Sequence, residues 1–169
     1  MAYLLVRPAE RADLARLVEI YNYYVIHTPI TFDVEPYTVE KRTAWFEQFA
    51  PNGRHRLLVA ENDAGLIGYA GTMRWRPKAA YDTTVETTIY CAHDAVGKGV
   101  GRRLYEALFS ALRGEDVHRY VAGYTMPNAA TAALHQRLGF RQVGIFREVG
   151  RKFGEYWDVC WMDRAGTGS

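Results

Sequence analysis

Apolar residues recur along the chain at two spacings, and together these predict four helices and seven strands. From Arg11 they recur every three or four residues, the pattern of an amphipathic helix; the positions are Leu14, Leu17, Val18, Tyr21 and Val25. A second helix is expected after Thr38, a good N-cap, and two more over 100–112 and 129–138. Runs rich in β-branched and aromatic residues predict strands over 4–7, 57–61, 66–74, 83–92, 118–124, 142–148 and 156–162.

The composition fits one globular α/β domain. The chain has 169 residues, 49% of them hydrophobic and 24% charged, which excludes a disordered or collagen-like chain. We expect the domain over residues 1–164, followed by a loose tail of small and polar residues over 165–169. The net charge of +2 is too even to favour nucleic acid or an anionic membrane as a partner.

The cysteine count and the N-terminal sequence favour a cytoplasmic location. Cys91 and Cys160 both lie in apolar, strand-like segments; one disulfide is possible, but two free thiols in a reducing cytosol are the favoured interpretation. The first residues lack the basic and apolar regions of a signal peptide. No apolar run approaches the roughly 18 residues of a membrane span. A soluble, cytoplasmic protein is therefore expected.

The most informative segment is a strand, a glycine-rich loop and a helix in direct succession. Three alternate glycines, at 97, 99 and 101, follow the strand that ends near Ala92. Glycines allow a tight turn and close approach of a ligand to the backbone, and a helix start offers unpaired N–H groups to a phosphate or pyrophosphate. A P-loop is excluded because Gly99 follows Lys98, and a Rossmann fingerprint fits poorly. An ordinary glycine-rich turn remains the alternative.

Two motifs resemble those of the GNAT N-acetyltransferase superfamily. The loop Gly97-Lys98-Gly99-Val100-Gly101-Arg102 is similar to the acetyl-CoA pyrophosphate loop of that family, Q/R-x-x-G-x-G/A, with Val96 at the Gln/Arg position. Downstream, Asn128 begins a segment that resembles N-x-x-A-x-x-x-Y-x-x-x-G-F. His135 stands in this segment where many members have Tyr.

Further motifs resemble the phosphinothricin and methionine sulfoximine N-acetyltransferase group. They are Trp75-Arg76-Pro77, the strand Thr84-Val85-Glu86-Thr87-Thr88-Ile89-Tyr90, the segment from Val149 to Trp157, and Thr31-Phe32. The resemblance covers roughly residues 6–163. It implies the GNAT fold, a twisted, mixed α/β sheet splayed at its centre and flanked by about four helices. Acetyl-CoA would lie between the strands ending near Ala92 and Tyr124. It also implies a homodimer in which the Lys152-Phe153 segment approaches the site of the partner.

Glu86 is the expected general base, because a carboxylate at the cleft supports deprotonation of the attacking amine. The alternative is a salt bridge to Arg74 or Arg76 within the sheet. Tyr90 lies four residues later on the same strand face, where it would orient the substrate or contact the thioester, unless it only packs. His135 stands where members of the resembling family have a Tyr that protonates the leaving thiolate, so it would supply that proton or a hydrogen bond, although a lone helical His is more often structural.

The resemblance also implies which residues contact the two substrates. Acetyl-CoA contacts are expected at Ile89, Tyr90, Cys91, Gly97, Lys98, Gly99, Val100, Gly101, Arg102, Asn128 and His135. The acceptor is expected to contact Phe32, Arg74, Arg76 and Glu86, although the basic residues would also suit a solvated hairpin end. The remaining histidines show no metal-ligand spacing, so no metal is expected. Nothing indicates a Ser or Cys nucleophile, which favours direct transfer over an acetyl-enzyme.

Three functions follow from these observations. The first is acetyl-CoA-dependent acetylation of the α-amino group of a small amino-acid-like acceptor, such as L-phosphinothricin or L-methionine sulfoximine. The second is the same chemistry on a peptide or protein amine. The third is a non-catalytic acyl-CoA sensor, which is disfavoured because a pure binder does not need Glu86, Tyr90 and His135.

Overall fold

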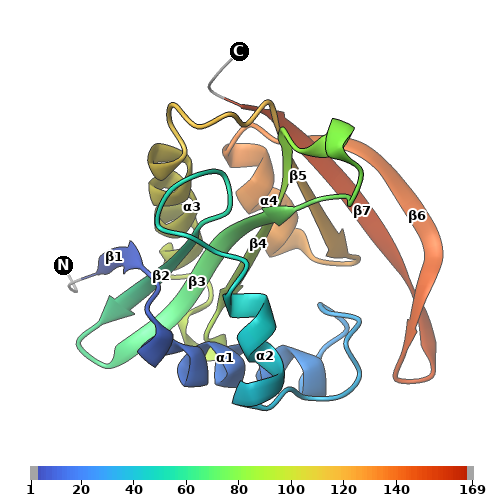
Figure 1. Cartoon of the computed structure of the whole chain (residues 1–169). Coiled ribbons are helices and arrows are strands. Elements are labelled where there is room, and N and C mark those ends of the chain that lie inside the picture. The colour runs from blue at the N-terminus through green and yellow to red at the C-terminus, as the bar shows by residue number, and fades with distance from the viewer. Residues whose placement is uncertain (1–3, 167–169) are drawn as a thin grey trace.

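The computed structural model describes residues 4–166 as a seven-stranded β-sheet with helices on both faces (Figure 1). The strands are β1 (Leu5–Pro8), β2 (Leu57–Asn62), β3 (Gly65–Arg74), β4 (Thr84–Cys91), β5 (Arg119–Thr125), β6 (Arg141–Lys152) and β7 (Glu155–Ala165). The α-helices are α1 (Leu14–His27), α2 (Val39–Phe46), α3 (Val100–Ala111) and α4 (Ala129–Arg137), with 3-10 helices at Arg11–Asp13, Ala79–Tyr81 and His93–Ala95. All the predicted helices and strands are present, and the last two strands are longer than predicted.

The sheet is mixed and opens at its centre. Its strand order is β1-β2-β3-β4-β5-β7-β6, and β4–β5 is the parallel pair among antiparallel neighbours. That parallel pairing joins only Thr84–Glu86 to Arg119–Val121, although both strands continue well beyond it. Beyond Glu86, therefore, β4 has no strand partner on the β5 side. The splayed sheet implied by the resemblance is confirmed.

Alternation along β4 directs its side chains to two different helix pairs. Successive residues of a strand point to opposite faces, so Glu86, Thr88 and Tyr90 share one face. The Tyr90 ring meets Tyr21 of α1, with 5.0 Å between the ring centroids, so this is the face covered by α1 and α2. The opposite face is covered by α3 and α4, as Thr87 shows: its Oγ1 lies 3.2 Å from the hydroxyl of Tyr105 on α3.

The β6–β7 hairpin extends past the rest of the sheet and contacts the loop that follows α1 (Figure 1). Lys152, at the end of β6, is buried, and its Nζ donates a hydrogen bond of 2.8 Å to the carbonyl of Thr31. The ring of Phe32 lies directly against the backbone of Gly150. The hairpin thus fixes the loop in which the sequence predicted Thr31 and Phe32.

The C-terminal segment stays ordered further than predicted. Ala165 ends β7 rather than beginning a loose tail, because it continues the pairing of β7 with Arg119 of β5. The amide of Gly166 then donates to the carbonyl of His118 at 2.8 Å. The rest of the expected tail, residues 167–169, lies outside the described residues.

Both cysteines are free thiols, as the sequence favoured. Cys160 is fully buried on β7, and Cys91 is half-buried at the end of β4. Within residues 4–166, no helix is both long and apolar enough to cross a membrane. The cytoplasmic location stays a prediction.

Candidate active site

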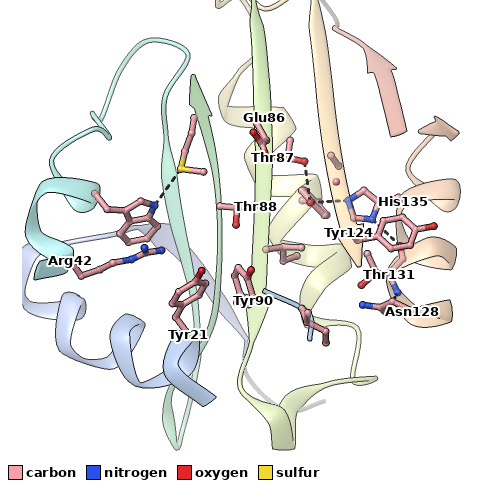
Figure 2. Close-up of a pocket in the computed structure, with 17 residues that line it drawn as sticks. Tyr21, Arg42, Glu86, Thr87, Thr88, Tyr90, Tyr124, Asn128, Thr131 and His135 are labelled. Carbon is pink, nitrogen blue, oxygen red and sulfur yellow. Dashed lines mark hydrogen bonds between the residues drawn. The ribbon is translucent and has the colours of Figure 1, made fainter. Parts of the chain in front are cut away.

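A cavity of about 300 Å³ occupies the place where β4 and β5 separate (Figure 2). Its walls include residues from α1, α2, β3, β4, α3, β5 and α4. Because both helix pairs contribute, the cavity passes through the plane of the sheet instead of lying on one face. Five of the predicted site residues line it: Glu86, Ile89, Tyr90, Asn128 and His135.

Glu86 lies in the last parallel pair before the strands diverge. It is opposite Met73 of β3 and Val121 of β5. Burial raises the pKa of its carboxyl above the usual value, and the nearby charge of Arg76 partly opposes this rise. Within residues 4–166, no ion pair involves Glu86; Arg74 instead binds Asp82 at 3.0 Å. The alternative of a salt bridge from Glu86 to Arg74 or Arg76 is therefore wrong.

Aromatic side chains surround Tyr90 on the α1–α2 face. Its ring centroid lies 5.2 Å from that of Tyr24 and 5.7 Å from that of Tyr69, in addition to the contact with Tyr21. Burial raises the pKa of Tyr90 to about 12, so the hydroxyl keeps its proton at neutral pH. Tyr21 is itself held by Thr31, whose Oγ1 lies 2.7 Å from the Tyr21 hydroxyl. This side of the cavity is therefore rigid and carries hydroxyl donors.

Arg42 and Trp45 of α2 also line the cavity. The sequence analysis did not identify either of them as a site residue. The indole Nε1 of Trp45 donates to the sulfur of Met73 at 3.3 Å, which fixes the indole beside β3. Arg42 lies over this indole, with 4.1 Å between the guanidinium carbon and the ring centroid. One signal was available: Arg42 precedes Trp45 by three residues, which puts a charge on the apolar face of the helix.

Main-chain amides of β4 point into the gap left by β5. Ala92 donates its N–H to Ile67 of β3 at 2.8 Å, and in an antiparallel pair alternate residues direct their polar groups to opposite sides. The N–H groups of Ile89 and Cys91 therefore point away from β3, toward the gap. Since β4 and β5 pair only as far as Glu86, these amides are positioned to donate to a bound group.

The glycine-rich loop forms the predicted turn into α3. Gly97 and Gly99 have φ angles of 81° and 80°, a left-handed conformation that residues with a Cβ adopt only under strain. Gly99 is the N-cap of α3, and its carbonyl accepts the first helical bond, from Arg103, at 3.2 Å. The amides at residues 100–102 precede that bond, so they have no partner within the helix. This geometry suits an anionic group.

The other predicted loop residues differ in how their side chains are used. Val100 is buried in the core, Lys98 is exposed, and Arg102 forms an exposed 2.7 Å pair with Glu106. The loop therefore offers its main chain to a ligand more than its side chains. At α4, the Asn128 side chain accepts a 3.0 Å bond from the Thr131 amide as the N-cap.

His135 of α4 is buried and held through both ring nitrogens. Its Nδ1 lies 2.8 Å from the carbonyl of Thr131 and its Nε2 lies 3.1 Å from the hydroxyl of Tyr105. A carbonyl can only accept, so Nδ1 carries the proton. Burial lowers the pKa of the imidazole, which keeps it neutral at neutral pH. Nε2 is therefore an acceptor, and the proton of that contact belongs to Tyr105.

Three residues predicted to contact the acceptor do not line this cavity. Phe32 packs on Gly150 of the hairpin, and Arg74 pairs with Asp82. Arg76 lines a second, largely apolar cavity of about 490 Å³ between β5, β6 and β7. Sequence order could not reveal this, because it does not show how the end of β3, which carries Arg74, and the turn after it, which carries Arg76, lie relative to the gap.

Comparison with known proteins agrees with this architecture. The model of the acetyltransferase (GNAT) domain family matches residues 6–161. The chain is 52% identical to a phosphinothricin N-acetyltransferase from Streptomyces coelicolor, over 94% of either chain. The chain belongs to the GNAT acetyltransferase family.

Further relatives define the group within the family. The chain is 39% identical to an L-methionine sulfoximine/L-methionine sulfone acetyltransferase from Pseudomonas paraeruginosa, over 93% of this chain and 91% of that one. A phosphinothricin acetyltransferase from Sinorhizobium meliloti, solved in complex with acetyl-CoA, has a TM-score of 0.91 and 30% identity, covering 98% of this chain and 91% of that one. This GNAT protein is thus an acetyltransferase enzyme of the phosphinothricin and methionine sulfoximine group.

Proposed function

We propose that the enzyme transfers the acetyl group of acetyl-CoA to the α-amino group of a small amino-acid-like acceptor, such as L-phosphinothricin or L-methionine sulfoximine. One observation carries this proposal: a single cavity is lined both by Glu86 and by Ile89, whose amide points into the gap between β4 and β5. The relatives named for these acceptors, at 52% and 39% identity, support the substrate class. The family match over residues 6–161 supports one catalytic domain over residues 1–164.

Acetyl-CoA would be held mainly by main-chain groups. The amides at the start of α3 and the positive φ angles of Gly97 and Gly99 fit a pyrophosphate. The amides of Ile89 and Cys91 fit the pantetheine arm and the thioester carbonyl, because they point into the gap. A hydrogen bond to a charged oxygen contributes about 1.5–3 kcal/mol, so a few such amides suffice to bind the diphosphate. When bound, this substrate supplies an acetyl group activated as a thioester.

Glu86 acts as the general base for the acceptor amine. An amine with a pKa of about 10.4 is almost fully protonated at pH 7.5, and removing the proton costs about 4 kcal/mol. Glu86 takes up this proton, directly or through water. The amine nitrogen then forms a bond to the acetyl carbon, the carbon–sulfur bond breaks, and the nitrogen loses a second proton while the departing CoA thiolate gains one. Both substrates are bound together during this direct transfer.

His135 is not placed to protonate the leaving thiolate. The sequence offered it for that proton or for a hydrogen bond, and a neutral imidazole whose Nε2 accepts a bond has no proton to give there. The Tyr105 hydroxyl lines the cavity and lies between His135 and Thr87. We assign His135 the role of positioning the Tyr105 hydroxyl.

We also propose that the enzyme is a homodimer built on the β6–β7 hairpin. Val143, Phe146, Val149 and Tyr156 are all more than half exposed on this hairpin, which is unusual for large apolar side chains clustered on one element. Trp157 and Trp161, by contrast, are half-buried within the chain. Light scattering should give twice the chain mass, and Phe146→Glu should give monomers, whereas Ile26→Glu, at an exposed position of α1, should not.

The acceptor class is tested by CoA release from acetyl-CoA with L-phosphinothricin, L-methionine sulfoximine, spermidine and a peptide in parallel. Saturable turnover with the first two is expected. Turnover of only the peptide or the polyamine would discard the proposed acceptor class but keep the chemistry. Tight CoA binding without turnover of any acceptor would favour a sensor.

A further inference from the structure

Arg42 is a charged residue on the apolar face of α2. Trp45 and Phe46 follow it by three and four residues, and both pack against the hydrophobic core. Residues at these spacings share one helix face. An arginine seldom lies on such a face unless it has a partner. Among residues 4–166, however, no carboxylate forms an ion pair with Arg42.

Three aromatic rings hold the guanidinium in place. Its central carbon lies 4.4 Å from the centroid of Tyr21, 4.8 Å from that of Tyr37 and 4.1 Å from that of Trp45. Cation–π contacts involve the ring faces, whereas the N–H donors of arginine lie in the plane of the guanidinium. The rings therefore fix the position of the cation; one of its in-plane donors interacts with the Tyr69 hydroxyl, and the others are left to bind an anion.

The guanidinium faces the same cavity as Glu86. Figure 2 shows Arg42 with its nitrogens directed toward the cavity, on the side where Thr88 and Tyr90 project from β4. Trp45, which stacks on Arg42, is bonded to Met73, and Met73 is the cross-strand neighbour of Glu86. The charge of Arg42 partly opposes the burial-driven rise in the pKa of Tyr90, which also places it close to this strand.

We propose that Arg42 binds the α-carboxylate of the acceptor, so that the site selects amines that carry a carboxylate on the neighbouring carbon. The inference rests on the proposed function and names the group that recognises its substrate class. A carboxylate paired with Arg42 leaves the adjacent amine directed toward Glu86, since one carbon separates the two groups. Guanidinium suits this task because its parallel donors match the two carboxylate oxygens. Arg74 and Arg76, expected in this role from the sequence, do not line the cavity.

The test compares two acceptors that differ only in the carboxylate: L-methionine sulfone and 3-(methylsulfonyl)propylamine. Arg42→Met should lower kcat/KM for L-methionine sulfone by about 50-fold, as expected for a lost charge-assisted bidentate contact. For the decarboxylated amine the loss should be less than about threefold. Each acceptor is compared with itself across the variants, so the different basicities of the two amines cancel.

Three further variants make the comparison decisive. Arg42→Lys keeps the positive charge but lacks the two parallel N–H donors of the guanidinium, so it should recover part of the activity toward L-methionine sulfone. Lys41→Met removes the same charge from the exposed side of α2 and should leave both acceptors unchanged. Arg76→Met should retain the preference for the carboxylate. The KM for acetyl-CoA and the melting temperature, measured for each variant, separate a lost contact from a damaged fold.

The outcomes separate this inference from the proposed function. Equal losses for the two acceptors in Arg42→Met, or loss of the preference in Arg76→Met instead, would overturn the role of Arg42 alone. Wild-type enzyme that turns over neither acceptor, or only the decarboxylated amine, would overturn the proposed acceptor class and the role of Arg42 with it.

Discussion

The two walls of the proposed site are built in different ways. The main-chain wall consists of the amides of Ile89 and Cys91 and the loop at 97–101, and it follows from backbone conformation; of these residues, Ile89 lines the cavity, and the loop lies beyond it. The side-chain wall consists of Arg42, Glu86 and Tyr90, and two separate elements, α2 and β4, bring these side chains together.

The difference shows how each wall responds to sequence change. In the main-chain wall, Val96 can stand where relatives of this kind of loop have Gln or Arg, because the amides remain in place. In the side-chain wall the chemistry depends on individual side chains: Glu86 is the carboxylate and Arg42 the guanidinium among the residues that line the cavity. Substitutions should therefore act through backbone strain in the first wall and through lost functional groups in the second.

The largest effect is expected for Glu86→Gln, which removes the base and leaves the shape of the side-chain wall intact. Loss of a general base lowers kcat by about 100-fold or more. The dissociation constant of acetyl-CoA should stay unchanged, because the main-chain wall is untouched. Steady-state kinetics and calorimetry measure the two quantities. Turnover close to that of the wild type would show that Glu86 is not the base.

A smaller effect is expected when the main-chain wall is strained by Gly99→Val. The φ angle of 80° at Gly99 is unfavourable for a β-branched residue, so the loop should shift and weaken acetyl-CoA binding about 10-fold or more. Gly114→Val is the matched control, since Gly114 has a φ angle of 82° at the far end of α3. The control should lose stability but keep its affinity; unchanged affinity in Gly99→Val would refute the loop as a binding site.

The pH dependence of the free energy of unfolding tests whether His135, which contacts Tyr105, is neutral in the folded protein. Its lowered pKa means that, below the unfolded value of about 6.5, the unfolded chain binds more protons than the folded chain. This contribution to stability is complete above pH 6.5 and is lost as the pH falls. In His135→Gln, the decrease in the free energy of unfolding between pH 7 and pH 5 should be smaller than in the wild type by about 1 kcal/mol. Urea unfolding at each pH measures it, and equal slopes in both proteins would contradict a neutral, buried His135.

The smallest effect concerns the electrostatics of the side-chain wall. The charge of Arg76 lowers the pKa of Glu86 against the rise caused by burial, so Arg76→Met should raise that pKa. Glu86 must be ionised to act as a base, and the acid limb of kcat/KM should therefore move to higher pH by about half a unit. Arg74→Met is the control, because Arg74 is paired with Asp82. A shift of the acid limb toward lower pH in Arg76→Met would contradict the effect of Arg76 on the pKa of Glu86.

The contrast between the walls also explains what the sequence could predict. The glycine loop and Glu86 carry local signals, namely a motif and a charge inside a buried strand, whereas the splay of the sheet was implied by the family resemblance; the turn and the splay are present as expected. The acceptor residues depend on how distant segments pack. Phe32 is therefore held by the β6–β7 hairpin, while Arg42 and Trp45, from a short helix without a motif, complete the site.

The central claim is that acetyl-CoA and the acceptor are bound at the same time, the first on the main-chain wall and the second on the side-chain wall. Initial rates measured over a grid of acetyl-CoA and L-methionine sulfone concentrations test this most directly. Double-reciprocal lines that intersect are the predicted result, because they require a ternary complex. Parallel lines would indicate an acetyl-enzyme intermediate and would contradict the account.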